Sequence, residues 1–268
     1  RLWPWHLVGS TRTRMGGVYV RRWSNFILSR QQFVVLLPPS EGKAEGGDRS
    51  SPWKPESGPF GDALGVWRRE LAAELARING GNEKLLGVKG AHLDRARAAN
   101  SSLVGAPTLP AWRRYTGVVW DHLGLASLPA TARNGALARI VVVSGLAGLV
   151  RADDPLPDYR LKMGARLPGY GALSGWWRDD LTDTLASWLK GRTVIDLLPQ
   201  EHHAAIDWSR IDAVRVDLVA RSGGRVGGHD AKAAKGLLAR HLLTGAGAVA
   251  PMVSSFRHDV YTTRIATA

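Results

Sequence analysis

The sequence predicts an α+β fold, a single compact domain in which helices flank a mixed β-sheet. Short, wholly apolar runs such as FVVLL at 33–37 are typical of buried strands, whereas apolar residues three and four apart predict amphipathic helices. The two patterns are mixed without a strict β-α-β order and without an internal repeat. With 268 residues, 44% of them apolar, the chain can bury a sizeable core in this fold.

The first half of the expected domain, which runs from 33 to 268, holds one strand and two helices. Pro38 and Pro39 end the strand at 33–37, and a Gly-, Ser- and Pro-rich loop to about residue 59 is long enough to favour function or mobility. Asn79-Gly80-Gly81 ends the first helix, and a short turn at 82–86 precedes a second helix from about Ala91 to Asn100. The first helix presents one apolar stripe: Leu64, Trp67, Leu71, Leu75 and Ile78.

The second half alternates strands and helices. Residues 115–125 fit either a strand edge or a helix start, and RIVVVSGLAGLVRADDPLPDYRLKMG predicts a buried strand, a Gly-rich turn, a short helix and a Pro-rich loop. The remaining predicted elements are an amphipathic helix at 176–189, a strand at 193–201 ending at a proline, a half-buried strand at 213–219, a hairpin turn at 221–228 and a helix at 230–243.

Residues 1–32 carry six arginines and no acidic residue. They contain no continuous apolar segment of the kind that a signal peptide requires. We therefore expect a basic, disordered N-terminal extension outside the folded domain. An arm that binds nucleic acid by charge alone is the weaker interpretation.

The whole chain is basic, with a formal net charge of +13. The excess beyond residue 32 points to an anionic partner such as nucleic acid, nucleotide or a membrane surface, although an arginine-rich, solvated surface would give the same charge. The absence of cysteine excludes disulfides, zinc fingers and cysteine nucleophiles, and it fits a reducing cytoplasm. No apolar run approaches the roughly 20 residues of a membrane span.

The tetrapeptide Gly87-Val88-Lys89-Gly90 fits the centre of a helix-hairpin-helix. In that motif the turn exposes consecutive N–H groups at the start of the second helix, which suits a phosphate oxygen. Lys89 and Arg95 add positive charge, and contacts of this kind would not read base sequence. A glycine turn between two packed helices, with Val88 in the core, accounts for the same residues equally well.

Other motifs suggest anion or acid–base chemistry. PPSEGK, which ends at Lys43, lacks the glycine spacing and the hydroxyl of a phosphate-binding loop. Arg160 and Lys162 are two apart, so they point the same way in an extended segment. Glu201 with His202 follows a strand end and could serve acid–base or metal chemistry, although a structural role is commoner. The acidic residues show no metal-loop spacing, so we expect neither metal nor cofactor.

Several segments together resemble the YaaA peroxide-stress protein family over residues 33–245. They are LLPPSEGK, YTGVVWDHL, SGLAGLVRADDPLPDYRLKMGARL, VIDLLPQEH and HDAKAAKGLLAR. The resemblance implies a bacterial, cytoplasmic protein that binds DNA and limits iron-driven peroxide damage, with a helix-hairpin-helix at Gly87–Gly90. It also implies a basic cleft lined by Lys43, Arg160, Lys162, Lys232, Lys235 and Arg240.

The sequence departs from the family pattern at several positions. Ala147 and Ala152 replace a tyrosine and a proline, and His202 stands where the family has a tyrosine after Glu201. Three hypotheses follow. The first is a monomeric peroxide-stress protein that binds double-stranded or distorted DNA independently of its sequence. The second is an enzyme on a phosphorylated or nucleotide substrate, with Glu201 or Asp121 as general base. The third, and weakest, is iron binding by Glu201, His202 and His203.

Overall fold

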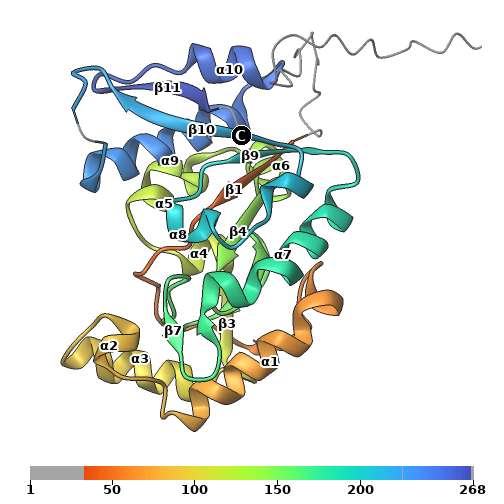
Figure 1. Ribbon diagram of the computed structural model, residues 1–268, viewed down its shortest axis with the longest axis vertical. Coiled ribbons are helices and arrows are strands. Elements are labelled where there is room, and N and C mark those ends of the chain that lie inside the picture. The colour runs from red at the N-terminus through yellow and green to blue at the C-terminus, as the bar shows by residue number, and fades with distance from the viewer. Residues whose placement is uncertain (1–32, 225, 267–268) are drawn as a thin grey trace, which may run out of the picture.

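The structure is a computed structural model that describes residues 33–224 and 226–266 (Figure 1). The predicted basic extension at 1–32 lies outside the described residues. Within them the expected α+β architecture with a mixed sheet is confirmed. None of the described helices is long and apolar enough to cross a membrane.

The main sheet has six strands in the order β11-β10-β9-β1-β4-β5. Strands β10, β9, β1 and β4 run parallel, and β11 and β5 add antiparallel edges. The strands are β1 (Phe33–Leu37), β4 (Ile140–Ser144), β5 (Gly148–Arg151), β9 (Thr193–Asp196), β10 (Ala213–Ala220) and β11 (Tyr261–Ala266). Every residue of β1, β4 and β9 is buried, as expected for parallel strands covered on both faces.

A smaller antiparallel sheet and a short hairpin lie below the main sheet in Figure 1. The small sheet has the order β2-β3-β6, and the hairpin is β7-β8. Their strands are β2 (Asp48–Pro52), β3 (Pro107–Pro110), β6 (Pro155–Pro157), β7 (Arg166–Leu167) and β8 (Gly171–Ala172). The long loop after β1 is therefore not wholly irregular, because β2 lies within it.

The helices form two groups around the main sheet. α5 and α6 both contact α9, whereas α7 contacts α1 and β5 on the opposite side (Figure 1). The longer helices are α1 (Gly61–Arg77), α3 (Ala91–Ser101), α6 (Ala130–Leu137), α7 (Leu173–Leu189) and α9 (Gly228–Thr244). The shorter ones are α2 (Glu83–Leu86), α4 (Ala111–Arg114), α5 (Val118–Leu123), α8 (Gln200–His203) and α10 (Val249–Ser255), with 3₁₀ turns at Leu125–Ser127 and Trp208–Arg210.

Two local predictions are wrong. The short helix expected after the buried strand of RIVVVSGLAGLVRADDPLPDYRLKMG is instead strand β5, which folds back on β4 after a turn at 145–147 and begins at Gly148, where φ is +65°. The hairpin turn expected at 221–228 leads into α9, because the antiparallel partner of β10 is the distant β11. Residues 115–125, which fitted either a strand edge or a helix start, contain helix α5.

Candidate functional site

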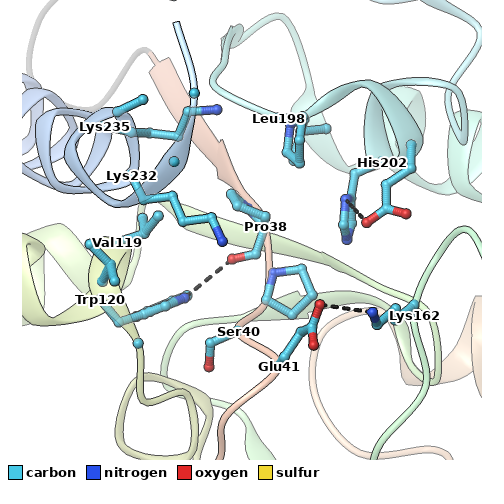
Figure 2. A pocket seen from close by; sticks show the side chains of 18 of the residues that line it. Pro38, Ser40, Glu41, Val119, Trp120, Lys162, Leu198, His202, Lys232 and Lys235 are labelled. Carbon is cyan, nitrogen blue, oxygen red and sulfur yellow. Dashed lines mark hydrogen bonds and ion pairs between the residues drawn. The ribbon is translucent and has the colours of Figure 1, made fainter. Parts of the chain in front are cut away.

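A cleft of about 850 Å³ opens at the carboxyl ends of β1 and β9 (Figure 2). One side is formed by Pro38–Lys43 after β1, and another by Leu198–His202 after β9. The chain passes from β1 to β4 on one side and later returns to β9 on the other. Parallel sheets bind ligands at such a switch point, because the connections leave in opposite directions and open a crevice. The order of the strands thus places the cleft.

The cleft is mainly cationic. Its walls carry seven basic side chains and three acidic ones, and five of the six residues predicted for a basic cleft are among them. The basic residues are Lys43, Arg160, Lys162, Arg215, Lys232, Lys235 and Arg264, and the acidic ones are Glu41, Glu201 and Asp217.

Lys43 is held at the base of the cleft, with only 8% of its surface exposed. Its ammonium donates to the Ser40 carbonyl oxygen at 2.9 Å and lies 4.0 Å from the centre of the Tyr159 ring. Burial is the main cause that lowers the pKa of Lys43 to about 7, against the opposing charge of Asp158. At neutral pH this amine is therefore available in both protonation states, as a general base or nucleophile requires.

A chain of buried hydroxyls supports the Tyr159 ring beneath Lys43. The Tyr159 hydroxyl is 2.7 Å from the Ser144 hydroxyl and 3.0 Å from that of Tyr115. Burial raises the pKa of Tyr159 to about 12, so the phenol stays protonated. Its role in this arrangement is to fix the aromatic face on which the lysine rests.

Glu41 binds two of the predicted cations. Its carboxylate is 2.6 Å from an Arg160 guanidinium nitrogen and 3.0 Å from the Lys162 ammonium. Burial alone would raise the pKa of Glu41, but hydrogen bonds and charge from Lys162 and Arg160 outweigh it and lower that pKa. Glu41 therefore remains ionised and offsets part of the positive charge in this region of the cleft.

Helix α9 supplies two further predicted cations. Lys232 points into the cleft (Figure 2) and has no hydrogen-bond or ion-pair partner among the described residues. Lys235 donates to the Leu197 carbonyl oxygen at 2.6 Å. Burial lowers the pKa of Lys235 to about 8, although the charge of Asp196 opposes the shift. Lys232 is thus the more available of the two for a ligand.

Arg240 does not line the cleft, which corrects the sequence prediction. Its guanidinium donates to the carbonyl oxygens of Leu123 and Gly124 at 3.0 and 2.6 Å. At 100° per residue on an α-helix, Arg240 lies about 80° around α9 from Lys232 and about 140° from Lys235. It therefore ties α9 to the end of α5 instead of facing the cleft.

His202 lines the cleft but is only 5% exposed. Neither ring nitrogen has a hydrogen-bond partner among the described residues, and the nearest carboxylate oxygen, on Glu201, is 3.7 Å from Nδ1. Burial, aided by the charge of Lys235, lowers the pKa of His202 to about 4. A buried polar group without a hydrogen-bond partner destabilises the folded protein by about 1–3 kcal/mol. Such a group in a native structure calls for an explanation, and a role in ligand binding is one.

His203 does not line the cleft. Its Nδ1 is 2.7 Å from Oδ2 of the buried Asp196, which also accepts from Arg215 at 3.1 Å. The ring of His203 stacks on Trp208 at 4.6 Å. Among the described residues no group of three or more His, Asp and Glu side chains is placed to hold a metal ion. The set Glu201, His202 and His203 is therefore not gathered around one point.

The predicted phosphate turn lies next to the cleft, not inside it. Gly87 ends α2 in the left-handed conformation, and Gly90 precedes α3 with φ +56°. Val88 packs against the small apolar cluster of Leu86, Leu93 and Ala96, whereas Lys89 is highly exposed and lies 3.7 Å from Glu83. The turn therefore combines an apolar anchor with an outward cation.

Two side chains connect the turn to the cleft. Arg160 Nε donates to the Leu86 carbonyl oxygen at 2.9 Å. A Cβ placed on Gly87 would lie 3.1 Å from the Lys162 ammonium nitrogen. Arg160 and Lys162, which line the cleft, thus also lie against the turn.

Arg95 and Asp121 lie outside the cleft. Arg95 binds Asp158 at 2.8 Å, Glu45 at 2.8 Å and the Lys43 carbonyl oxygen at 2.8 Å. The Arg95 guanidinium is therefore already paired, and it holds α3 against the loop after β1. Asp121 is exposed on α5 and does not line the cleft, which leaves Glu201 as the predicted carboxylate that does.

Comparison with known proteins decides the family. A family model described as "Peroxide stress protein YaaA" matches residues 33–265. The chain belongs to the YaaA peroxide stress protein family. A UPF0246 protein of Streptomyces coelicolor is 38% identical over 221 residues, which cover 78% of this chain and 82% of that protein. A UPF0246 protein of Corynebacterium efficiens is 35% identical over 217 residues, with 79% and 85% covered.

Some cleft residues of this YaaA-family chain were not predicted as site residues. Glu41 sits inside the SEGK motif, and its position beside a strand end was the available signal. Arg215 and Asp217 belong to the strand predicted at 213–219, and nothing in its alternating pattern indicates that they meet a cleft. Arg264 comes from the chain end, far from every motif. No sequence pattern could have brought it to the site.

Proposed function

We propose that this protein acts in peroxide stress by binding DNA through its backbone, with the Gly87–Gly90 turn and the mouth of the basic cleft as one contact surface. The continuity of turn and cleft through Arg160 carries the proposal, because Arg160 lines the cleft and also donates to the Leu86 carbonyl. An 850 Å³ cleft is the size of a small-molecule site. The duplex would therefore lie across the mouth and not within it.

The turn provides the groups that a phosphate needs. Gly87 and Gly90 both have positive φ, and a Cβ at Gly90 would meet nothing within 4 Å, so the backbone there is open to approach. The eleven residues of α3 begin immediately after Gly90, and the first N–H groups of a helix lack intrahelical acceptors. Such contacts position the protein on DNA without reading sequence. Limiting iron-driven damage is the part of this role that rests on the family resemblance alone.

The test is fluorescence anisotropy with three duplexes of unrelated sequence, measured at several salt concentrations. Lys89→Glu should weaken binding about tenfold on all three, and it should lower the slope of log affinity against log salt by about one. Gly90→Val should weaken binding similarly because Val does not adopt this backbone conformation. Lys54→Glu is the matched control, since Lys54 is exposed and does not line the cleft. Unchanged binding by both turn variants would overturn the role of the turn.

A second candidate is an enzyme acting on a phosphorylated or nucleotide substrate. It is favoured by one observation: a lysine with a pKa near 7 lines the same cleft as the carboxylate of Glu201. Arg160, Lys162 and Lys232 would hold the anion, and Glu201 would be the general acid–base group. Incubation with phosphorylated metabolites, followed by mass spectrometry, tests it. Turnover that survives in Lys43→Met and in Glu201→Gln would exclude the assigned roles.

A further inference from the structure

We propose that the interior of the cleft is a binding site for a nucleoside monophosphate unit, with its phosphate at the first turn of α9 and its base beside His202. The proposal goes beyond DNA binding at the turn and the mouth of the cleft, and it holds whether or not that binding occurs. The ligand could be a free mononucleotide or one unit of a single strand, and the experiment below distinguishes these sources.

His202 is the first observation. Its imidazole is more than nine-tenths buried and lines the cleft, and neither ring nitrogen has a hydrogen-bond partner among the described residues, since the Glu201 carboxylate lies 3.7 Å from Nδ1. A neutral imidazole offers one donor and one acceptor. A base edge presents donors and acceptors side by side, so it can satisfy such a ring.

The start of α9 is the second observation. Gly227 and Gly228 line the cleft at the N-terminus of this 17-residue helix, and Lys232, one turn further on, reaches into the cleft without a partner among the described residues. Free N–H groups, the helix dipole and a cation together favour a phosphate. Asp230 belongs to the same turn but is exposed and does not line the cleft.

The relative position of these groups fits one ligand that has a hydrogen-bonding base at one end and an anion at the other. Lys232 and His202 come from opposite sides of the cleft, and Pro38 lies between them (Figure 2). Apolar groups on Pro38, Leu198 and Val216 line the space around them. A volume of about 850 Å³ accommodates far more than an inorganic anion. In a nucleoside monophosphate the base would lie beside His202, the sugar against the apolar groups, and the phosphate beside Lys232.

Isothermal titration calorimetry of the full chain tests the proposal with four ribonucleoside monophosphates, their nucleosides, inorganic phosphate and a short single-stranded oligonucleotide. At least one mononucleotide should bind more tightly than its nucleoside and more tightly than phosphate. Lys232→Ala and His202→Phe should each weaken it about tenfold, the effect of one lost hydrogen-bond partner. His202→Gln, which keeps a donor and an acceptor, should recover part of the loss. Lys54→Glu, at an exposed lysine outside both the cleft and the turn, should bind mononucleotide as the wild type does.

Each outcome decides a different point. Tighter binding of the oligonucleotide, with the same dependence on His202, would support the site and identify a strand as its source. Phosphate binding as tightly as any mononucleotide would overturn the nucleotide assignment. Absence of binding by mononucleotides and by oligonucleotide would overturn the site itself. Duplex affinity of Lys89→Glu, measured separately, reports on the proposed function and not on this site. If His202→Phe does not fold by circular dichroism, Lys232→Ala and His202→Gln carry the test.

Discussion

The guanidinium of Arg160 joins the cleft to the Leu86 carbonyl oxygen, with Nε and the oxygen 2.9 Å apart. The same side chain binds Glu41 at 2.6 Å on the cleft side. Arg160→Met should therefore leave a carbonyl of α2 without its partner and loosen the turn. We expect faster amide hydrogen exchange at residues 87–90, with exchange in β1 and β4 unchanged. Equal protection in variant and wild type would show that Arg160 does not hold the turn.

Asn100 anchors the same region from inside the protein. Its buried amide donates to the carbonyl oxygens of Gly80 and Arg160 at 3.0 and 2.8 Å, and it accepts from the Arg160 N–H at 2.9 Å. Asn100→Leu keeps the volume but leaves these backbone groups unpaired, so unfolding free energy should fall by about 2–4 kcal/mol. Urea denaturation measures this. Asn79→Leu is an unsuitable control because Asn79 has positive φ, whereas exposed Asn134→Leu should have little effect.

Because of His202, the free energy of unfolding should fall as the pH is lowered. Its pKa is about 4 in the folded protein and ordinarily 6.5, so between these values the unfolded chain binds more protons. The contribution of neutral His202 is therefore fully present above about pH 6.5 and is lost as pH falls toward 4. The difference in unfolding free energy between wild type and His202→Phe should change by up to about 1.4 kcal/mol per pH unit in this range. A constant difference from pH 7 to pH 4.5 would contradict the buried, neutral state.

Lys43 should affect the free energy of unfolding in the alkaline range. Its pKa is about 7 in the folded protein, below its ordinary 10.5, because burial disfavours the charged form. Between these values the unfolded chain binds more protons, so wild-type stability should rise with pH relative to Lys43→Met. We expect a relative gain of about 2 kcal/mol from pH 7 to pH 9. Urea unfolding of both proteins measures it, and parallel pH profiles would show that Lys43 is charged throughout.

The strongest periodic and apolar segments were sufficient for much of the fold. FVVLL became the buried centre of the sheet, and the stripe from Leu64 to Leu75 became the buried face of α1. The predictions for two short Gly-rich segments were wrong, because their structure depends on how the neighbouring strands pair in the sheet. Gly148–Arg151 forms a strand because β4 lies beside it, and 221–228 continues into α9 because β11 occupies the edge of β10.

For the candidate site, too, some features could be predicted from the sequence and others depended on the tertiary structure. The sequence by itself determined which cations exist, where the glycines permit a tight turn and that the chain resembles one family. Only the tertiary structure decided that Lys232 faces the cleft while Arg240 faces α5, since that depends on the angle around a packed helix. Burial in the folded protein likewise changed the chemistry of Lys43 and His202, because desolvation depends on neighbours that are remote in sequence.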